Sequence, residues 1–364
     1  MDRDIRLDAC RGIALWFVFL DHIPNNVCSW LTLAHYGFSD TTEIFMFVSG
    51  VTCALAYGKV RHRHGWWAAA SHTLRRSWEI YAAFLALIIA MVVVIYWFGN
   101  DQFANEANVK VLLEQPGAAL AHAVILQYRP VNTDVLPTFI VFHLCFAPLL
   151  WLLLKLPDGA LGASFLLYVL VQVFGWNLPQ WPRNDWYFNP FAWQFLIVLG
   201  AWWAIGGRKR LKRFITSRVA VILSVLYLLI AMILVFGWSF KPLQEIVPPF
   251  VARLIYPIDK SDLDPLRLVH FLAIAVLVAR FVPADWSGLR TPVLRGAIRC
   301  GENSLEIYCL GVLMSLGAQM LLTDISSDML MQSIVSAGGI VLLVMFATWS
   351  TWIGKASRQQ PKLF

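Results

Sequence analysis

Long apolar runs, separated by short polar stretches, follow one another along almost the whole chain. A helix that spans a membrane needs about 20 predominantly apolar residues. Ten runs approach that length, at residues 10–30, 40–58, 78–98, 134–154, 160–178, 190–206, 218–238, 265–282, 303–322 and 329–353. The pattern predicts an all-α polytopic membrane protein with about ten transmembrane helices, forming a single integral-membrane domain over residues 1–364.

Basic residues are distributed unevenly between the segments that connect these runs. If the N-terminus lies in the cytoplasm, 22 of the 29 Lys and Arg residues fall on the cytoplasmic side. Cytoplasmic loops of membrane proteins carry such an excess of positive charge. An even number of helices returns the C-terminus, with Lys355, Arg358 and Lys362, to the same side. The sequence therefore predicts that both termini are cytoplasmic.

The composition agrees with a multi-pass membrane protein. Hydrophobic residues make up 59% of the 364 residues, and charged residues only 14%. The net charge of +7 follows the predicted topology, so we do not infer nucleic-acid binding. The six cysteines are scattered without a CxxC pair or a metal-like cluster, and therefore predict neither a metal site nor a permanently bound cofactor.

The first apolar run contains an arginine and a histidine eleven residues apart, Arg11 and His22. Eleven residues make about three helical turns, so Asp8, Arg11 and His22 share one face, with His22 about 16 Å along the axis from Arg11. Ionisable side chains at membrane depth are costly and usually mark a reaction site or pathway. A histidine in a membrane helix can also be a packing residue. Its alignment with Asp8 and Arg11 favours a catalytic His22.

Glu43 and Asp134 lie near the predicted outer ends of two other runs. There they can meet a polar acceptor or orient His22, and we predict both to be catalytic. Asp21 is a poorer partner for His22, because neighbouring residues on a helix point about 100° apart. The alternative for both carboxylates is a hydrogen bond between helices, which stabilises a membrane protein by about 0.6 kcal/mol on average.

The predicted outer segment 179–189 mixes aromatic and polar residues. Aromatic faces pack on sugar C–H groups, while Asn, Asp and Arg form hydrogen bonds with sugar hydroxyls, so this segment predicts a sugar-facing surface. Asn189, Trp193 and His270 are the acceptor-binding residues that we predict. The alternative is an aromatic belt at the membrane interface, where Trp and Tyr are enriched.

Four segments resemble a known family. Arg11 and His22 match the R-x10-H signature of the acyltransferase-3 superfamily. The local sequences resemble its OpgC family, densely over residues 3–58 and in patches to about residue 311, at Arg6–Gly12, Thr42–Gly50, Asn132–Pro137 and Gly301–Tyr308.

The resemblance implies a membrane-embedded acyltransferase of the bacterial inner membrane. Members of the OpgC family are implicated in adding succinyl groups to osmoregulated periplasmic glucans of Gram-negative bacteria. The co-substrate implied is a cytoplasmic acyl-CoA, with succinyl-CoA expected. His22 would act as general base on the glucan hydroxyl or pass the acyl group on. Arg11, with Asp8, would bind the donor, because the rigid guanidinium fork suits phosphate or carbonyl oxygens.

Other functions remain open at this stage. Acetyl transfer to another envelope polysaccharide shares every motif described above. A glycan or solute transporter without chemistry should show paired broken helices in two related halves, which the sequence lacks. A non-catalytic scaffold leaves the Arg11–His22 pair unexplained. A succinyl group also carries a free carboxylate that calls for a cation, and Arg129, Arg183 and Arg253 are the outer-side candidates.

Overall fold

The structure, a computed structural model, describes residues 4–182, 184–239, 250, 255–283 and 285–359. These residues are almost entirely helical, and their one β-bridge, between Pro179 and Asp185, is isolated. The chain divides into two compact units. We call Met1–Leu33 with Val282–Phe364 the terminal unit, and Ala34–Phe281 the central unit.

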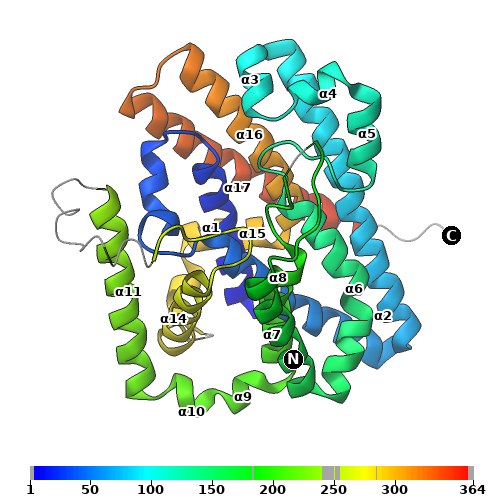
Figure 1. The fold of residues 1–364 in the computed structure, drawn as a ribbon, viewed down its shortest axis with the longest axis vertical. Helices are drawn as coiled ribbons and strands as arrows, with labels where there is room; N and C mark the ends of the chain where they lie inside the picture. Colours follow the sequence, from blue (N-terminus) through cyan, green and yellow to red (C-terminus); the bar gives the residue numbers. More distant parts are fainter. Residues whose placement is uncertain (1–3, 183, 240–249, 251–254, 284, 360–364) are drawn as a thin grey trace. The chain divides into compact units, whose positions relative to one another are not determined.

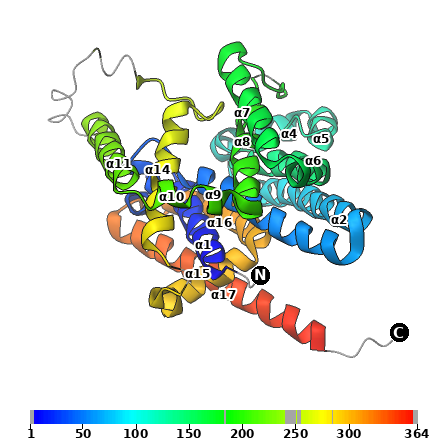
Figure 2. The same ribbon diagram turned by 90° about the horizontal axis from the view of Figure 1, so that it is seen from below.

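The terminal unit brings the first helix of the chain onto the last ones. Its elements are α1 (Ile5–Asp21), η1 (Val27–Leu31), η4 (Ser287–Arg290), α15 (Pro292–Glu302), α16 (Ser304–Asp324) and α17 (Met329–Gln359). Helix α1 packs against α15 and α16, and α15 packs against α17 (Figure 2).

Two glycines allow α1 and α15 to cross at close range. A Cβ atom at Gly12 would lie 1.8 Å from the carbonyl oxygen of Ala297, and one at Gly301 would lie 2.0 Å from that of Asp8. Small residues of this kind let membrane helices approach backbone to backbone. The crossing fixes the part of α1 that carries Asp8 and Arg11.

The central unit contains the remaining helices (Figure 1). They are α2 (Thr41–Phe98), α3 (Asp101–Glu106), α4 (Lys110–Glu114), α5 (Pro116–Val124), α6 (Val135–Lys155), α7 (Pro157–Phe174), α8 (Pro190–Trp202), the π-helical turn η3 (Trp203–Gly207), α9 (Arg208–Arg210), α10 (Lys212–Ile215), α11 (Arg218–Ser239) and α14 (Pro265–Phe281). The short η2 (Leu33–His35) lies at the sequence boundary of the two units.

Helix α2 is the element around which the central unit is built. It packs against α6 and α8, while α7 packs on α8 and α11 pairs with α14. The crossing of α2 and α8 also depends on glycine. A Cβ atom at Gly50 or Gly200 would lie 2.1 Å from the carbonyl oxygen of Ile197 or Phe47, respectively. Close packing at this crossing positions the N-terminal end of α2, which carries Glu43.

The sequence predicts a cytoplasmic loop at residues 59–76, but the structure has helix there. Helix α2 runs through both flanking predicted spans and bends at Gly65, which has φ 84°. No proline interrupts this stretch, so the helix can continue on both sides of the bend. Glycine adopts a positive φ without the steric cost that a Cβ atom brings, so the turn needs only one residue.

Seven described helices are long and apolar enough to cross a membrane. One of them, α2, covers two of the predicted spans. Helix α14 coincides with another predicted span and α1 overlaps the first one, but each has 17 residues, slightly fewer than the usual length. The all-helical class is therefore confirmed, with seven candidate membrane-spanning helices among the described residues, and the count of ten and the side of the termini remain predictions.

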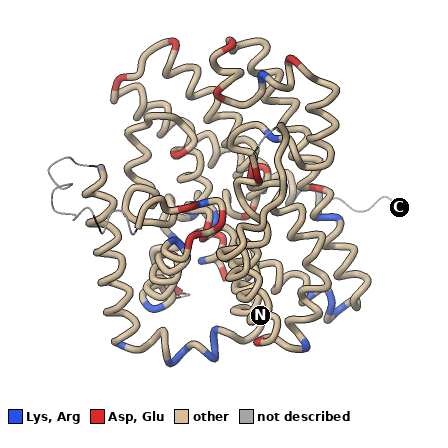
Figure 3. Tube along the Cα trace, in the orientation of Figure 1, with Lys and Arg blue, Asp and Glu red and all other residues tan. Residues whose placement is uncertain are grey.

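Basic residues in the central unit gather where helices turn. Figure 3 shows Lys and Arg along α9 and α10, and further basic positions near the bend of α2. The short helices α3 and α4, on the side predicted to be extracytoplasmic, instead contain Asp101, Glu106 and Glu114 beside the single Lys110. This asymmetry is typical of the two sides of a membrane protein.

Candidate functional site

Helix α1 brings Asp8 and Arg11 together, as the spacing predicts. The helix begins after Asp4, whose side chain accepts a hydrogen bond from the backbone N–H of Arg6. Asp8 is buried, and its Oδ1 lies 4.0 Å from Nη1 of Arg11. The same Nη1 donates to the carbonyl oxygen of Gly301, at 3.4 Å, near the C-terminus of α15. A helix C-terminus carries partial negative charge, so it favours a guanidinium there.

His22 lies one residue beyond the last helical residue of α1. The predicted span 10–30 is wrong in its second half, because α1 ends at Asp21 and η1 follows at Val27–Leu31. Pro24 explains the stop, since proline has no N–H and restricts the residue before it. His22 is the C-cap residue, with φ −82° and ψ −6°, and its N–H still makes the helical i to i−4 hydrogen bond, to the carbonyl oxygen of Val18 at 3.0 Å. It therefore continues the helical path of Arg11, and its side chain is half-buried.

Asp21 has a described partner of its own. Its Oδ1 accepts a hydrogen bond from the hydroxyl of Thr32 at 2.7 Å, and that hydroxyl also donates to the carbonyl oxygen of Ser29. Asp21 thus ties the end of α1 to the segment that follows η1, and its unsuitability as the partner of His22 stays a prediction.

In the central unit, the start of α2 carries two acidic residues that cap the helix reciprocally. The side chain of Asp40 accepts from the N–H of Thr42 at 2.8 Å, and Glu43 Oε2 accepts from the N–H of Asp40 at 3.0 Å. This capping box satisfies N–H groups that a helix start leaves without partners. It also fixes the side chain of Glu43, which is completely buried.

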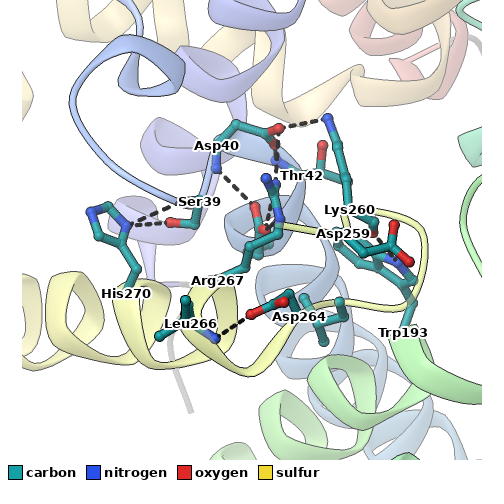
Figure 4. Close-up of polar contacts among 12 residues, drawn as sticks. Ser39, Asp40, Thr42, Trp193, Asp259, Lys260, Asp264, Leu266, Arg267 and His270 are labelled. Carbon is teal, nitrogen blue, oxygen red and sulfur yellow. Dashed lines mark hydrogen bonds and ion pairs between the residues drawn. The ribbon is translucent and has the colours of Figure 1, made fainter. Parts of the chain in front are cut away.

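Two cations from distant parts of the sequence bind these carboxylates (Figure 4). Arg267, on α14, donates from Nε to Oε1 of Glu43 at 2.8 Å, and its Nη2 lies 2.6 Å from the same oxygen and 3.1 Å from Oδ2 of Asp40. Lys260 Nζ lies 2.5 Å from Oδ2 of Asp40. Burial raises the pKa of Asp40, but Lys260 and Arg267 outweigh burial and hold that pKa below its ordinary value.

Asp134 pairs with a different arginine. Arg129 Nε lies 3.0 Å from Oδ1 of Asp134, which immediately precedes α6. Burial raises the pKa of Asp134 above its ordinary value, and Arg129 and Lys260 oppose that shift. Lys260 thus acts on both Asp40 and Asp134. We call these six residues the charge network: Asp40, Glu43, Asp134, Arg129, Lys260 and Arg267.

Asn189 and Trp193 hold the loop that carries Lys260. Trp193 Nε1 donates to the carbonyl oxygens of Lys260 and Ser261, at 3.2 and 3.0 Å, and Asn189 Nδ2 donates to Oδ1 of Asp262 at 2.7 Å. Both side chains are completely buried at the start of α8. Their described role is to position the loop, and direct contact with an acceptor remains a prediction.

His270, on α14, contacts the segment that leads into α2. Its Nδ1 lies 2.7 Å from the hydroxyl oxygen of Ser39, and a Cβ atom at Gly37 would collide with its ring. Its ring also packs against those of Phe38 and Tyr227. His270 therefore fixes the entry to α2 beside Asp40, and its contact with an acceptor likewise remains a prediction.

Lys260 and Arg267 are the residues that reasoning from the sequence missed. Arg267 stands only two residues inside a predicted span, so it reads as an interfacial charge. The capping pattern Asp40-x-x-Glu43 could have predicted that the Glu43 carboxylate is held at the start of a helix. No nearby residue in the sequence, however, indicates that Arg267 is its partner. Of the cations proposed for a succinyl carboxylate, Arg129 binds Asp134, while Arg183 and Arg253 lie outside the described residues.

Within the described ranges, no group of three or more His, Cys, Asp and Glu side chains is arranged to hold a metal ion.

The comparisons with known proteins agree with these features. The OpgC_C family, described as OpgC protein, matches residues 3–355. No curated protein and no solved structure matches the chain. The family match includes α1 with Arg11 and His22, and every member of the charge network. The chain belongs to the OpgC family, which indicates a multi-pass membrane protein with a glucan-modifying, acyltransferase-type function.

Proposed function

We propose that the protein is an O-acyltransferase that moves a succinyl group from cytoplasmic acyl-CoA to a hydroxyl of an extracytoplasmic glucan. The observation that carries the proposal is the placement of Arg11 and His22 along one helical path in a chain of the OpgC family. We place the protein in the bacterial inner membrane, with about ten spans and both termini in the cytoplasm.

His22 is the general base in this proposal. Its imidazole takes the proton of the glucan hydroxyl as the hydroxyl oxygen attacks the thioester carbonyl carbon. The tetrahedral intermediate then collapses with cleavage of the C–S bond, and the CoA thiolate leaves and receives the proton from His22. An imidazole suits this exchange, because it can accept and return a proton near neutral pH.

Arg11 binds the donor. Its planar guanidinium offers paired donors to phosphate or thioester oxygens, a geometry that lysine cannot reproduce. Asp8 and the carbonyl oxygen of Gly301 keep Arg11 in place from the side of α15. The basic residues of α9, α10 and the bend of α2 attract polyanionic CoA to the cytoplasmic face.

The charge network acts on the acceptor. Asp134 is the proposed contact for an incoming hydroxyl, because its side chain is 20% exposed, whereas that of Glu43 is 0% exposed. Glu43 is held by Arg267 and by the backbone of Asp40, so it keeps the start of α2 rigid beside the acceptor.

Mass spectrometry of envelope glycans from cells with and without the protein tests this function. We expect succinyl substituents on glucans only when the protein is present. A mass increment of an acetyl group instead would show that the protein transfers acetyl rather than succinyl. Glycans with identical substituents in both strains would contradict acyl transfer and favour a transporter.

A further inference from the structure

An exposed aromatic ring lies beside the charge network. Tyr187, in the loop before α8, is 44% exposed, and Nζ of Lys260 lies 5.9 Å from the centroid of its ring. The same ammonium lies 5.6 Å from the ring of Phe188, which is buried. Trp193 and Asn189 anchor the loop segment of Lys260, so the ammonium is held in position next to the open ring.

Asp134 is a partly exposed carboxylate of the same region, and a buried arginine holds it in place. Arg129 is only 1% exposed, and its Nε lies 3.0 Å from Oδ1 of Asp134. Nη2 of Arg129 donates to Oε1 of Gln180 at 2.8 Å, and the guanidinium lies 4.6 Å from the ring centroid of Trp186, the neighbour of Tyr187. Nη1 is buried and has no hydrogen-bond partner among the described residues. Arg129 thus joins Asp134 to the aromatic loop.

The formal charges of the six-residue charge network cancel. Asp40, Glu43 and Asp134 face Arg129, Lys260 and Arg267, so the network has no net charge to attract a strongly charged ligand. An open aromatic ring, a carboxylate and an ammonium instead suit a neutral polyhydroxylated ring. The C–H face of a pyranose packs on the aromatic ring, and its hydroxyls donate to the carboxylate and accept from the ammonium.

We propose that Tyr187, Lys260 and Asp134 form a subsite for one neutral pyranose unit, and that Arg129 is the positioning residue for Asp134. The subsite rests on the proposed function, because the pyranose is taken to belong to the acceptor glucan. It adds to that function the residues that bind the sugar ring.

Sugar binding can be measured without acyl transfer. Saturation-transfer difference NMR on the full-length protein in lipid nanodiscs, with cellopentaose as the probe and without acyl donor, should show saturation of the ring C–H protons. A hydrogen bond to a charged group contributes about 1.5–3 kcal/mol, so Asp134→Asn should weaken binding about tenfold or more. Tyr187→Ala should weaken binding, and Tyr187→Phe should retain most of it.

A matched control is available on α2. Tyr96 is 72% exposed, and Tyr96→Ala removes the same side chain far along the helix from Glu43. This variant should bind cellopentaose as the wild type does. An oligomer of glucuronate should bind more weakly than cellopentaose, because the one ring in the subsite would bring a second carboxylate next to Asp134. Equal affinity of wild type and Tyr187→Ala, with both proteins showing the same thermal unfolding, would overturn the subsite.

The positioning role of Arg129 has a separate readout, the pH dependence of cellopentaose binding. The charged groups acting on Asp134 are Arg129 and Lys260. Arg129 opposes the rise in the pKa of Asp134, so Arg129→Gln should raise that pKa further. As the pH falls, Asp134 should therefore become protonated, and cellopentaose binding should be lost, at a higher pH than in the wild type. Arg129→Lys should return the pH dependence of cellopentaose binding toward that of the wild type. Weaker binding with an unmoved profile would contradict the positioning role.

The subsite and the proposed function can fail independently. If cells with the protein show no acylated glucan, but cellopentaose binding depends on Tyr187 and Asp134, transfer fails and the subsite holds. If glucans are acylated, but Tyr187→Ala and Asp134→Asn leave binding unchanged, the subsite fails and transfer holds.

Discussion

The terminal and central units both place charged residues among apolar helices, but they stabilise them in different ways. In the terminal unit, Arg11 lies one turn from Asp8 and donates to a backbone carbonyl at a glycine-mediated helix crossing. In the central unit, ion pairs join side chains that are far apart in sequence, such as Glu43 with Arg267. Charges that are neighbours on one helix can be recognised from local spacing, and charges that pair between helices cannot.

Substitutions in the two units should therefore change different properties of the protein. Removal of one member of a buried ion pair leaves the other uncompensated, which typically destabilises a protein by about 3–5 kcal/mol. We therefore expect substitutions in the charge network to lower stability, and substitutions of Arg11 or His22 to lower activity in a protein that still folds.

Glu43→Gln should have the largest effect on stability. It leaves the guanidinium of Arg267 with one charged partner, Asp40, instead of two, so the free energy of unfolding should fall by up to about 3 kcal/mol, the lower end of the range for an uncompensated charge. Acyl transfer should fall with it, because the start of α2 loses its anchor. Thermal unfolding in detergent, followed with glucan acylation in cells, measures both.

Asp21→Asn is the comparison variant in the terminal unit. It alters the hydrogen bond with Thr32, and should cost about 1 kcal/mol and little activity. If Asp21→Asn proved more damaging than Glu43→Gln, the contrast between the two units would be wrong.

Arg11→Lys should affect activity far more than stability. A point charge cannot reproduce the paired donors of a guanidinium, and the loss of one charge-assisted hydrogen bond to the donor lowers the rate about 10- to 100-fold. The initial rate of transfer from acyl-CoA in purified protein tests this, with the melting temperature as its control. Full activity in the variant would indicate that Arg11 serves only as a cytoplasmic positive charge that sets the membrane topology.

The helix crossing of the terminal unit can be tested with glycine substitutions. Gly12→Ala would place a methyl group against the carbonyl of Ala297, and overpacking of this kind typically costs about 1–3 kcal/mol. Gly317→Ala, on α16, is the matched control, since no atom lies within 4 Å of the added carbon. Equal melting temperatures of the two variants would argue against a tight α1–α15 crossing.

The last prediction concerns how stability changes in acid. The pKa of Asp40 is held below 3.8 in the folded protein, so its ion pairs contribute fully above that pH and are lost as the pH falls through the lower folded value. Asp40→Asn removes this contribution. The difference in melting temperature between wild type and variant should narrow as the pH falls below 3.8, and a constant difference would contradict this account.

Much of the helical framework was predictable from the apolar runs. Helix α6 begins one residue after its predicted start, and α8, α11, α14, α16 and α17 begin at or within one residue of theirs. These boundaries follow from local length and hydrophobicity. The bend of α2 was missed, because a basic, polar stretch reads as a loop even when its residues can form helix.

The candidate site was predictable only where spacing along one helix defined it. Asp8 and Arg11 meet as the helical period requires, and His22 follows despite the early end of α1. The partners of Glu43 and Asp134 depend on tertiary structure. Arg267 lies more than two hundred residues after Glu43, and the role of Asn189 and Trp193 in holding a loop follows from contacts that no local pattern encodes.

The central claim is that His22 acts as the general base when an acyl group passes from a cytoplasmic donor to an acceptor on the other side of the membrane. The most direct measurement uses oriented proteoliposomes with isotope-labelled succinyl-CoA on the cytoplasmic face and glucan on the other, and mass spectrometry of the glucan. We predict labelled glucan with wild-type protein, and none with a His22→Ala variant of equal thermal stability. Equal labelling by the two proteins would contradict the account.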